Sequence, residues 1–269
     1  MPSYEHVLIP PVPTTEFSDV YEEGGSIILI DLAHDNAFDK EELNVLILRL
    51  VSRDLTIKFF DAGNDLKMEL LGKGEEEGDL EGELLGKEED LEEELTVPDA
   101  SIVVCPRLEF SKEERESVGE FVSNGGKLLL IADPTRYGEM NSLSLDFSLL
   151  SEPNFLYNMR ENETNYRNIF AAEFKDNEIT KELEKIALHI ASSISSADSG
   201  ITFVDEHTFS SMVGTRTRLS PVALTEEFTV LTLYDPTFMT EPHNGIVDNN
   251  QLISNMANCL ASPTEKEAQ

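Results

Sequence analysis

Polar residues whose side chains could do chemistry follow directly on several short apolar runs of the chain. The set that follows these runs comprises Asp31, His34, Asn36, Arg107, Asp133 and Asp235. In an open α/β sheet, ligands bind beyond the carboxyl ends of the strands. We therefore predict that these side chains meet at one rim of a sheet and form a polar binding site for a small ligand.

Two interpretations of the group Asp31, His34 and Asp133 stay open. In the first, His34 or one of the acids acts as a general base in a metal-assisted hydrolase. In the second, the acids accept hydrogen bonds from the first backbone N–H groups of the following helices, a frequent role for aspartate at such turns. Metal binding is less favoured, because a metal site needs three or four ligands and His34 is the only histidine expected on this rim. We predict no bound cofactor.

Neither cysteine has the sequence surroundings of a nucleophile. Cys105 ends an apolar run but is followed by Pro106, which has no N–H to stabilise a thiolate or an oxyanion. We expect Cys105 to be a small buried hydrophobic residue and Cys259 to be structural. The chain also has no G-x-S-x-G elbow, P-loop or G-x-G-x-x-G motif.

The composition limits the classes of partner. The 269 residues include 20 Lys and Arg against 53 Asp and Glu, which gives a formal net charge of −33. Nucleic acid is excluded as a partner, because phosphate contacts need Lys or Arg side chains and a field of the opposite sign. A small ligand or a protein partner remains, and the oligomeric state is left open.

No stretch of the sequence predicts a membrane span. The longest apolar runs have the length of strands, far below the roughly 20 residues of a spanning helix. Residues 1–25 form a proline-containing segment that we expect to be extended and that lacks the basic and apolar regions of a signal peptide. The chain as it stands is therefore predicted to be cytoplasmic. Attachment to a membrane through a partner or a further segment stays open.

Short apolar runs alternate with helical patterns in the first half of the chain. The runs lie at 27–31, 56–60, 101–105 and 127–132. They are typical of buried parallel strands. Helical spacing follows Asp39, and a capping-box spacing opens a second helix at Ser111, which ends at Gly125. This alternation predicts a doubly wound α/β fold, a three-layer sandwich around a mostly parallel sheet.

The second half of the chain carries weaker signals. The expected elements are a helix over 179–195, strands over 200–204 and 228–234, and a closing amphipathic helix from Asn249 to Leu260. Residues 26–262 are predicted to form a single domain, and residues 263–269 a flexible tail.

An acidic, low-complexity insertion at about 65–95 interrupts the first half. Between Glu69 and Glu94 there are 13 acids and two lysines, a net charge of −11. We interpret the insertion as a solvent-exposed, partly mobile helical segment in the connection between the second and third strands. A docking surface for a basic partner is the alternative interpretation.

Five short motifs together resemble a known family. They are Asp31 to Phe38, Ala100 to Cys105, Phe121 to Asp133, Tyr234 to Thr240 and Asp248 to Leu260. Their order is similar to that of the DUF4350-type family of unknown function. That family in turn is similar to the amidotransferase-like (GIFT-type) domain of a gliding-motility ABC-transport auxiliary protein and an intraflagellar transport subunit. The resemblance covers most of residues 26–262 and implies a class I glutamine amidotransferase-like, flavodoxin-related sandwich.

The resemblance also carries an expectation about activity. In active amidotransferases of this fold, a cysteine nucleophile stands on a sharp turn after the strand that matches 127–131, where this chain has Ala132-Asp133-Pro134. The resemblance therefore implies a catalytically inactive binding or interaction domain, auxiliary to an ABC-type transport system. It adds Asn249 and Asn250 to the candidate residues of the rim.

Overall fold

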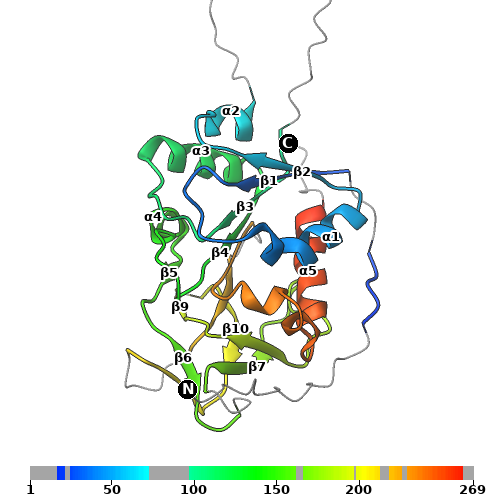
Figure 1. Ribbon diagram of the computed structural model, residues 1–269, viewed down its shortest axis with the longest axis vertical. Coiled ribbons are helices and arrows are strands. Elements are labelled where there is room, and N and C mark those ends of the chain that lie inside the picture. The colour runs from blue at the N-terminus through cyan, green and yellow to red at the C-terminus, as the bar shows by residue number, and fades with distance from the viewer. Residues whose placement is uncertain are drawn as a thin grey trace, which may run out of the picture.

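A nine-stranded sheet runs through the protein and joins both halves of the chain (Figure 1). In their order across the sheet, the strands are β2 (Thr56–Phe60), β1 (Ile27–Asp31), β3 (Ala100–Val104), β4 (Lys127–Ile131), β13 (Val230–Leu233), β12 (Val222–Leu224), β10 (Gly200–Val204), β7 (Asn168–Phe174) and β8 (Ile186–His189). The computed structural model describes residues 17–21, 25–72, 97–161, 166–196, 198–212, 218–225 and 229–262.

The half of the sheet from β2 to β13 is parallel, as predicted from its apolar runs. β1 pairs with β2 and β3, and β4 pairs with β3 and β13, all in parallel register. Parallel strands are buried on both faces, so consecutive residues rather than alternate ones are apolar. All five residues of β3 are buried, for example. The four apolar runs of the first half are confirmed as strands.

Helices cover both faces of the parallel strands and make three layers. On one face, α1 (Asn44–Ser52) and α5 (Asn249–Ala261) pack on Ile28 and Ile30. On the other, α2 (Leu66–Leu71) and α3 (Lys112–Ser123) pack on Leu29. The Ser111 hydroxyl caps α3 in the predicted capping box. The predicted α/β sandwich is confirmed.

The remaining strands make the sheet mixed. β13, β12, β10, β7 and β8 pair with one another in antiparallel register. The smaller elements are the short helical turns η1 (Lys40–Leu43), α4 (Asn141–Ser144), η2 (Leu145–Phe147), η3 (Thr237–Met239) and η4 (His243–Gly245), the strand pair β5 (Leu150–Ser151) and β9 (Ile194–Ser195), and the pair β6 (Leu156–Asn158) and β11 (Thr208–Ser210).

The helix predicted over 179–195 is wrong, because this stretch contains turns and the strands β8 and β9. Asn177 Oδ1 accepts hydrogen bonds from the N–H groups of Ile179 and Thr180, which holds a turn where the helix was expected to begin. His189, placed in that helix by the prediction, ends β8 instead. The apolar residues from Ile186 to Leu188 are consecutive because both faces of β8 are covered.

Several predictions concern residues outside the described ranges. They are most of the proline-containing segment at 1–25, the acidic insertion beyond residue 72, and the tail at 263–269. In the described part of the chain, no helix combines the length and apolar character that crossing a membrane requires.

Candidate functional site

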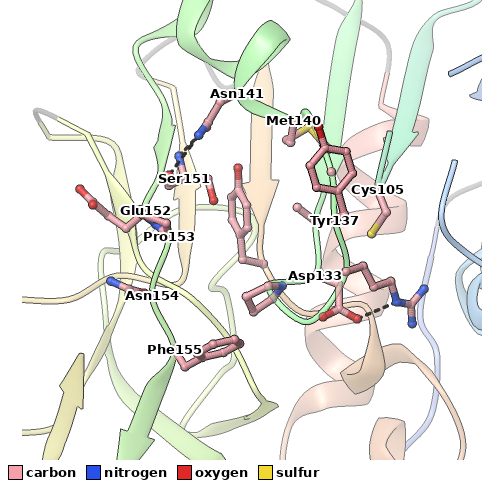
Figure 2. Close-up of a pocket in the computed structure, with 15 residues that line it drawn as sticks. Cys105, Asp133, Tyr137, Met140, Asn141, Ser151, Glu152, Pro153, Asn154 and Phe155 are labelled. Carbon is pink, nitrogen blue, oxygen red and sulfur yellow. Dashed lines mark hydrogen bonds and ion pairs between the residues drawn. The ribbon is translucent and has the colours of Figure 1, made fainter. Parts of the chain in front are cut away.

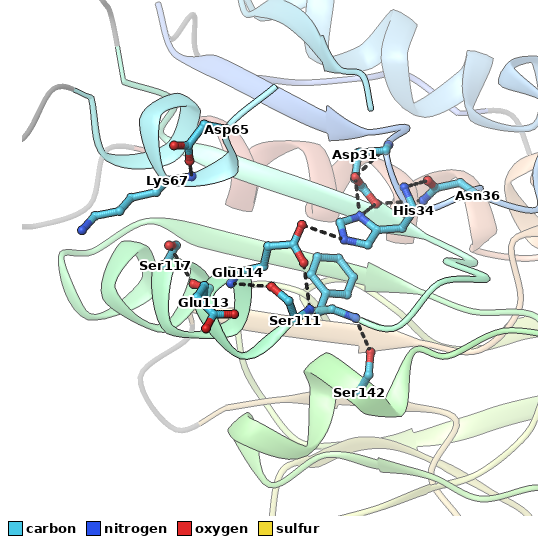
Figure 3. Close-up of polar contacts among 12 residues, drawn as sticks. Asp31, His34, Asn36, Asp65, Lys67, Ser111, Glu113, Glu114, Ser117 and Ser142 are labelled. Carbon is cyan, nitrogen blue, oxygen red and sulfur yellow. Dashed lines mark hydrogen bonds and ion pairs between the residues drawn. The ribbon is translucent and has the colours of Figure 1, made fainter. Parts of the chain in front are cut away.

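Asp31, His34 and Asn36 join in one hydrogen-bonded group at the carboxyl end of β1. The Nδ1 atom of His34 lies 2.9 and 3.0 Å from the two carboxylate oxygens of Asp31. The Asn36 amide donates to Asp31 Oδ2 at 3.0 Å and to the Val104 carbonyl at 2.9 Å. Of the predicted group Asp31, His34 and Asp133, the structure joins Asp31 and His34, with Asn36 as their third partner (Figure 3). Asp133 pairs with Arg136 instead.

The other side of the His34 ring meets helix α3. Its Nε2 atom is 3.5 Å from Glu114 Oε1, and the ring stacks on Phe110 with 3.7 Å between centroids. Glu114 also accepts a hydrogen bond from the Ser111 N–H in the capping box. His34 is buried, with both ring nitrogens and one face in contact with protein. His34 therefore links the end of β1 to the start of α3 through its side-chain contacts.

The charges around His34 predict that its contribution to stability depends on pH. Burial lowers the pKa of His34, but the Asp31 hydrogen bond and the charges of Asp31 and Glu114 outweigh it and raise the pKa above 6.5. Protonated His34 therefore stabilises the fold in full below pH about 6.5, and this stabilisation is lost as the pH rises through the folded-state pKa. In urea unfolding from pH 5.5 to 9, the stability difference between the wild type and His34→Gln should shrink with rising pH. A constant difference would show that the pKa of His34 is the same in the folded and unfolded states, and a difference that grows with pH would show that burial lowers it.

A cavity of about 380 Å³, here called the strand-end pocket, lies beside the carboxyl ends of β3, β4 and β13. Its walls come from Cys105, from the turn at 132–138, from Tyr234 and from the segment 151–155. Figure 2 shows the ring of Phe155 pointing toward the turn that carries Asp133. This is the place where the α/β architecture predicts a ligand. Of the candidate residues, Asp133 alone lines it.

The positive charge at the pocket is already paired. The Arg136 guanidinium donates to Glu42 at 2.8 Å and to the Ala37 carbonyl at 2.7 Å, and its Nε lies 2.9 Å from Asp133 Oδ2. These carboxylates raise the pKa of Arg136 above its ordinary value. Asp133 Oδ1 accepts from the Thr135 N–H at 2.8 Å, within a turn and not at the first residues of a helix, where the capping interpretation had placed this bond. The pocket therefore offers no unpaired guanidinium to an anion.

The thiol beside the pocket is unreactive. Cys105 is buried, and burial raises its pKa to about 12, so the thiol stays protonated at neutral pH. The prediction of a small buried residue at Cys105 is confirmed. Cys259 lies on α5, half-buried, with a pKa that burial also raises.

Asp235 is buried below the surface of the rim. Its Oδ2 accepts from the His189 N–H at 2.6 Å and its Oδ1 from the Thr237 N–H at 2.8 Å, so it ties β8 to the turn after β13. Burial raises the pKa of Asp235 to about 7, and the nearby charge of Asp133 adds to this rise.

The other candidates lie apart from the pocket. Asn249 exchanges hydrogen bonds of 2.9 and 2.8 Å with the backbone of Ala187, and Asn250 accepts from Arg49 at 2.8 Å between α1 and α5. Arg107 is exposed and 3.6 Å from Asp35. The candidate residues therefore do not form the single predicted site but lie in several separate groups. The described residues contain no group of three His, Cys, Asp or Glu side chains that could hold a metal ion.

The sequence analysis missed the aromatic and amide side chains of the pocket. Tyr137, Asn154 and Phe155 fall in a polar stretch with few structural signals, and only the turn residues Pro153 and Asn154 mark it as a loop. Nothing in their spacing shows that they face the ends of β3 and β4.

The fold of this chain matches that of a solved structure. The structure aligns with that of the mmIFT52 N-terminal domain at a TM-score of 0.66 and 12% identity, over 87% of this chain and 97% of that one. The chain has the fold of that domain. The predicted α/β sandwich is confirmed at the level of the fold, and the amidotransferase-like assignment stays a prediction. No family model and no curated protein matches the chain significantly, so the finer DUF4350-type assignment stays a prediction.

Two further structures align at lower scores. An α-L-fucosidase isoenzyme 2 from Paenibacillus thiaminolyticus aligns at a TM-score of 0.47 and 10% identity, over 88% of this chain and 32% of the enzyme. A ThuA-like protein from Parabacteroides merdae aligns at 0.46 and 10% identity, over 91% of this chain and 93% of that protein.

Proposed function

We propose that this chain is a non-catalytic binding domain of amidotransferase-like fold and that the strand-end pocket is its binding site. The observation that carries the proposal is the position of the pocket beside the ends of β3, β4 and β13, together with a buried thiol whose pKa of about 12 keeps Cys105 protonated. Open α/β sheets bind their ligands at this edge. The absence of a cysteine from Ala132-Asp133-Pro134 agrees with binding rather than acyl transfer.

The lining of the pocket indicates the class of ligand. The rings of Tyr137 and Phe155 are 71% and 44% exposed, so a ligand can contact their apolar surfaces in the folded protein. Asn141 and Asn154 supply amide groups nearby, although both already bond to neighbouring residues. Because Arg136 is neutralised, we expect a small ligand with an aromatic or apolar face and no phosphate group.

The association with an ABC-type transport system extends this proposal and rests on the family resemblance. Its test is affinity purification of the tagged full chain from detergent-solubilised host cells. Recovery of a transporter subunit that is absent when an unrelated tagged acidic protein is used would support the association. Repeated recovery of the chain alone would contradict it.

No observation favours the metal-assisted hydrolase. Both ring nitrogens of His34 face carboxylates, Phe110 covers one face of the ring, and Asp133 is paired with Arg136. A general base needs a free nitrogen or oxygen within reach of substrate.

A thermal-shift screen against small aromatic and amphipathic metabolites, with inorganic phosphate as an anionic probe, tests the binding site. A ligand of the folded state at a hundredfold excess over its Kd adds about 2.7 kcal/mol, which raises Tm by roughly 5–10 °C. We expect such a shift for at least one aromatic compound, no shift for phosphate, and loss of the shift in Phe155→Ala.

The control for this screen is Phe59→Ala, which removes an aromatic ring of similar exposure (38%) from β2, outside the pocket. It should keep the full shift. A shift that survives Phe155→Ala, or the absence of any shift in the wild type, would contradict the proposed site.

A further inference from the structure

A short N-terminal segment, residues 17–21, lies across the pair of helices α1 and α5. The carboxylate of Asp19 accepts from the Nη1 and Nη2 atoms of Arg53 at 3.1 and 3.0 Å and lies 3.0 Å from Arg49 Nη1. Ser254 on α5 also donates its hydroxyl to Asp19. One aspartate thus meets two arginines and a serine from two helices.

Arg53 makes this contact specific for a carboxylate. Its side chain is 0% exposed, and its other hydrogen bonds go to neutral acceptors: Asn258 Oδ1 at 2.7 Å, the Arg49 carbonyl at 2.8 Å and Ser254 Oγ at 3.0 Å. A buried guanidinium needs a negative partner, and a carboxylate matches its planar fork with two parallel hydrogen bonds. Asp19 alone among its contacts supplies that charge.

Alternate residues of the segment face the helices. The Phe17 ring lies 4.5 Å from the Arg49 guanidinium carbon, and the Tyr21 ring lies 4.7 Å from that of Arg53. Between them, Val20 is 81% exposed. Side chains that alternate in this way belong to an extended chain, so the segment presents an aromatic–x–Asp–x–aromatic pattern to the helices.

Only side chains attach the segment. Among the described residues, no backbone–backbone hydrogen bond joins 17–21 to another part of the chain, and the segment belongs to no helix or strand. Recognition of an acidic motif by clustered arginine side chains is a common mode of protein–peptide binding. The residues that receive the segment, Arg49, Arg53 and Ser254, all come from helices of the folded core.

We propose that the surface formed by Arg49, Arg53 and Ser254 is an acceptor site for an extended aromatic–x–Asp–x–aromatic segment of a partner protein. Residues 17–21 occupy this site within the chain and compete with the partner's segment. The partner is recognised by its carboxylate at Arg53 and by an aromatic ring on each arginine. This inference is independent of the strand-end pocket, which lies at the carboxyl ends of the strands.

The test uses the full chain and a fluorescent peptide with the sequence of residues 14–24. In the variant Phe17→Ala/Asp19→Asn/Tyr21→Ala, the site is released, and we expect the peptide to bind at least tenfold more tightly than to the wild type. The same peptide with Asp19→Asn should bind at least tenfold more weakly. In the released variant, Arg49→Met should weaken binding. Arg115→Met should not change it, because Arg115 is a half-buried arginine of α3 that pairs with Asp146.

A second measurement covers the case in which the released variant does not fold. A protease site is inserted between Tyr21 and Ser26 of the otherwise wild-type chain, which is cleaved after folding. The labelled peptide should then exchange with the cleaved segment, and Tm should fall on dilution.

Three outcomes of these binding experiments would overturn the inference. They are equal binding of the peptide to the wild type and the released variant, equal binding of the Asp19→Asn peptide, and no exchange after cleavage. A wild-type dimer that the Asp19→Asn substitution dissolves would also overturn it, because a second copy would then be the occupant.

Discussion

Replacing Asp19 with asparagine is expected to lower the free energy of unfolding by about 3 kcal/mol. The substitution keeps the size of the side chain but leaves Arg53, which is 0% exposed, without its negative partner. Removing one partner of a buried ion pair costs about 3–5 kcal/mol, because the remaining charge is buried and uncompensated. We take the lower end, since the Asp19 side chain is 21% exposed and water can approach the pair.

Urea unfolding at pH 7 measures this loss. The matched control is Asp35→Asn, because Asp35 is 64% exposed and 3.6 Å from Arg107. Exposed pairs of this kind contribute about 0–1 kcal/mol. A loss at Asp19 no larger than the loss at Asp35 would show that Arg53 finds enough stabilisation from its neutral acceptors, and the specificity argued for the acceptor site would fail with it.

The ion pair between Asp19 and Arg53 should weaken at acidic pH. Burial raises the pKa of Asp19, but hydrogen bonds from Arg53 and Ser254 and the charges of the two arginines outweigh it, and the net pKa lies below the ordinary value. The stabilisation is therefore complete above the unfolded-state pKa of about 3.9 and is lost as the pH falls through the folded-state pKa.

The parallel half of the fold could be predicted because its signals are local. Strands such as β3 are covered on both faces and form uninterrupted apolar runs, and Ser111 with Glu114 marks the start of α3 within four residues. The antiparallel half lacks such signals. β8 depends on Asn249, whose amide pairs with the backbone of Ala187 across 62 residues of chain. No local pattern around Ala187 contains that information.

The contacts of the candidate site likewise include some that the sequence could predict and some that it could not. Asp31, His34 and Asn36 could be placed together because they leave the same strand. The contact between His34 and Glu114 could not be predicted in this way. The capping-box spacing predicts that Glu114 lies at the start of α3, but not that it lies against the His34 ring. The aromatic wall of the pocket, including Phe155, depends on tertiary placement of an irregular segment.

Asp235 is expected to make the fold more stable at pH 5 than at pH 7. Its folded-state pKa is about 7, whereas the ordinary value is 3.8, so between these values the folded state holds a proton that the unfolded state has released. The free energy of unfolding therefore falls as the pH rises through this window and levels off above pH 7. A difference of about three pKa units corresponds to about 4 kcal/mol, which is an upper bound for the total change.

The comparison that isolates this effect is urea unfolding of the wild type and Asp235→Asn from pH 4 to 8. All other carboxylates titrate in both proteins, so their contributions cancel in the difference. The wild type should lose stability relative to Asp235→Asn as the pH rises, and the Asp133→Asn background should shift the loss to lower pH, because the charge of Asp133 helps to raise the Asp235 pKa. Parallel pH curves would mean that the hydrogen bonds from the N–H groups of His189 and Thr237 suffice to keep Asp235 ionised despite its burial. The rim beneath the strand-end pocket would then carry two negative charges at neutral pH, and a cationic ligand would be favoured over a neutral one.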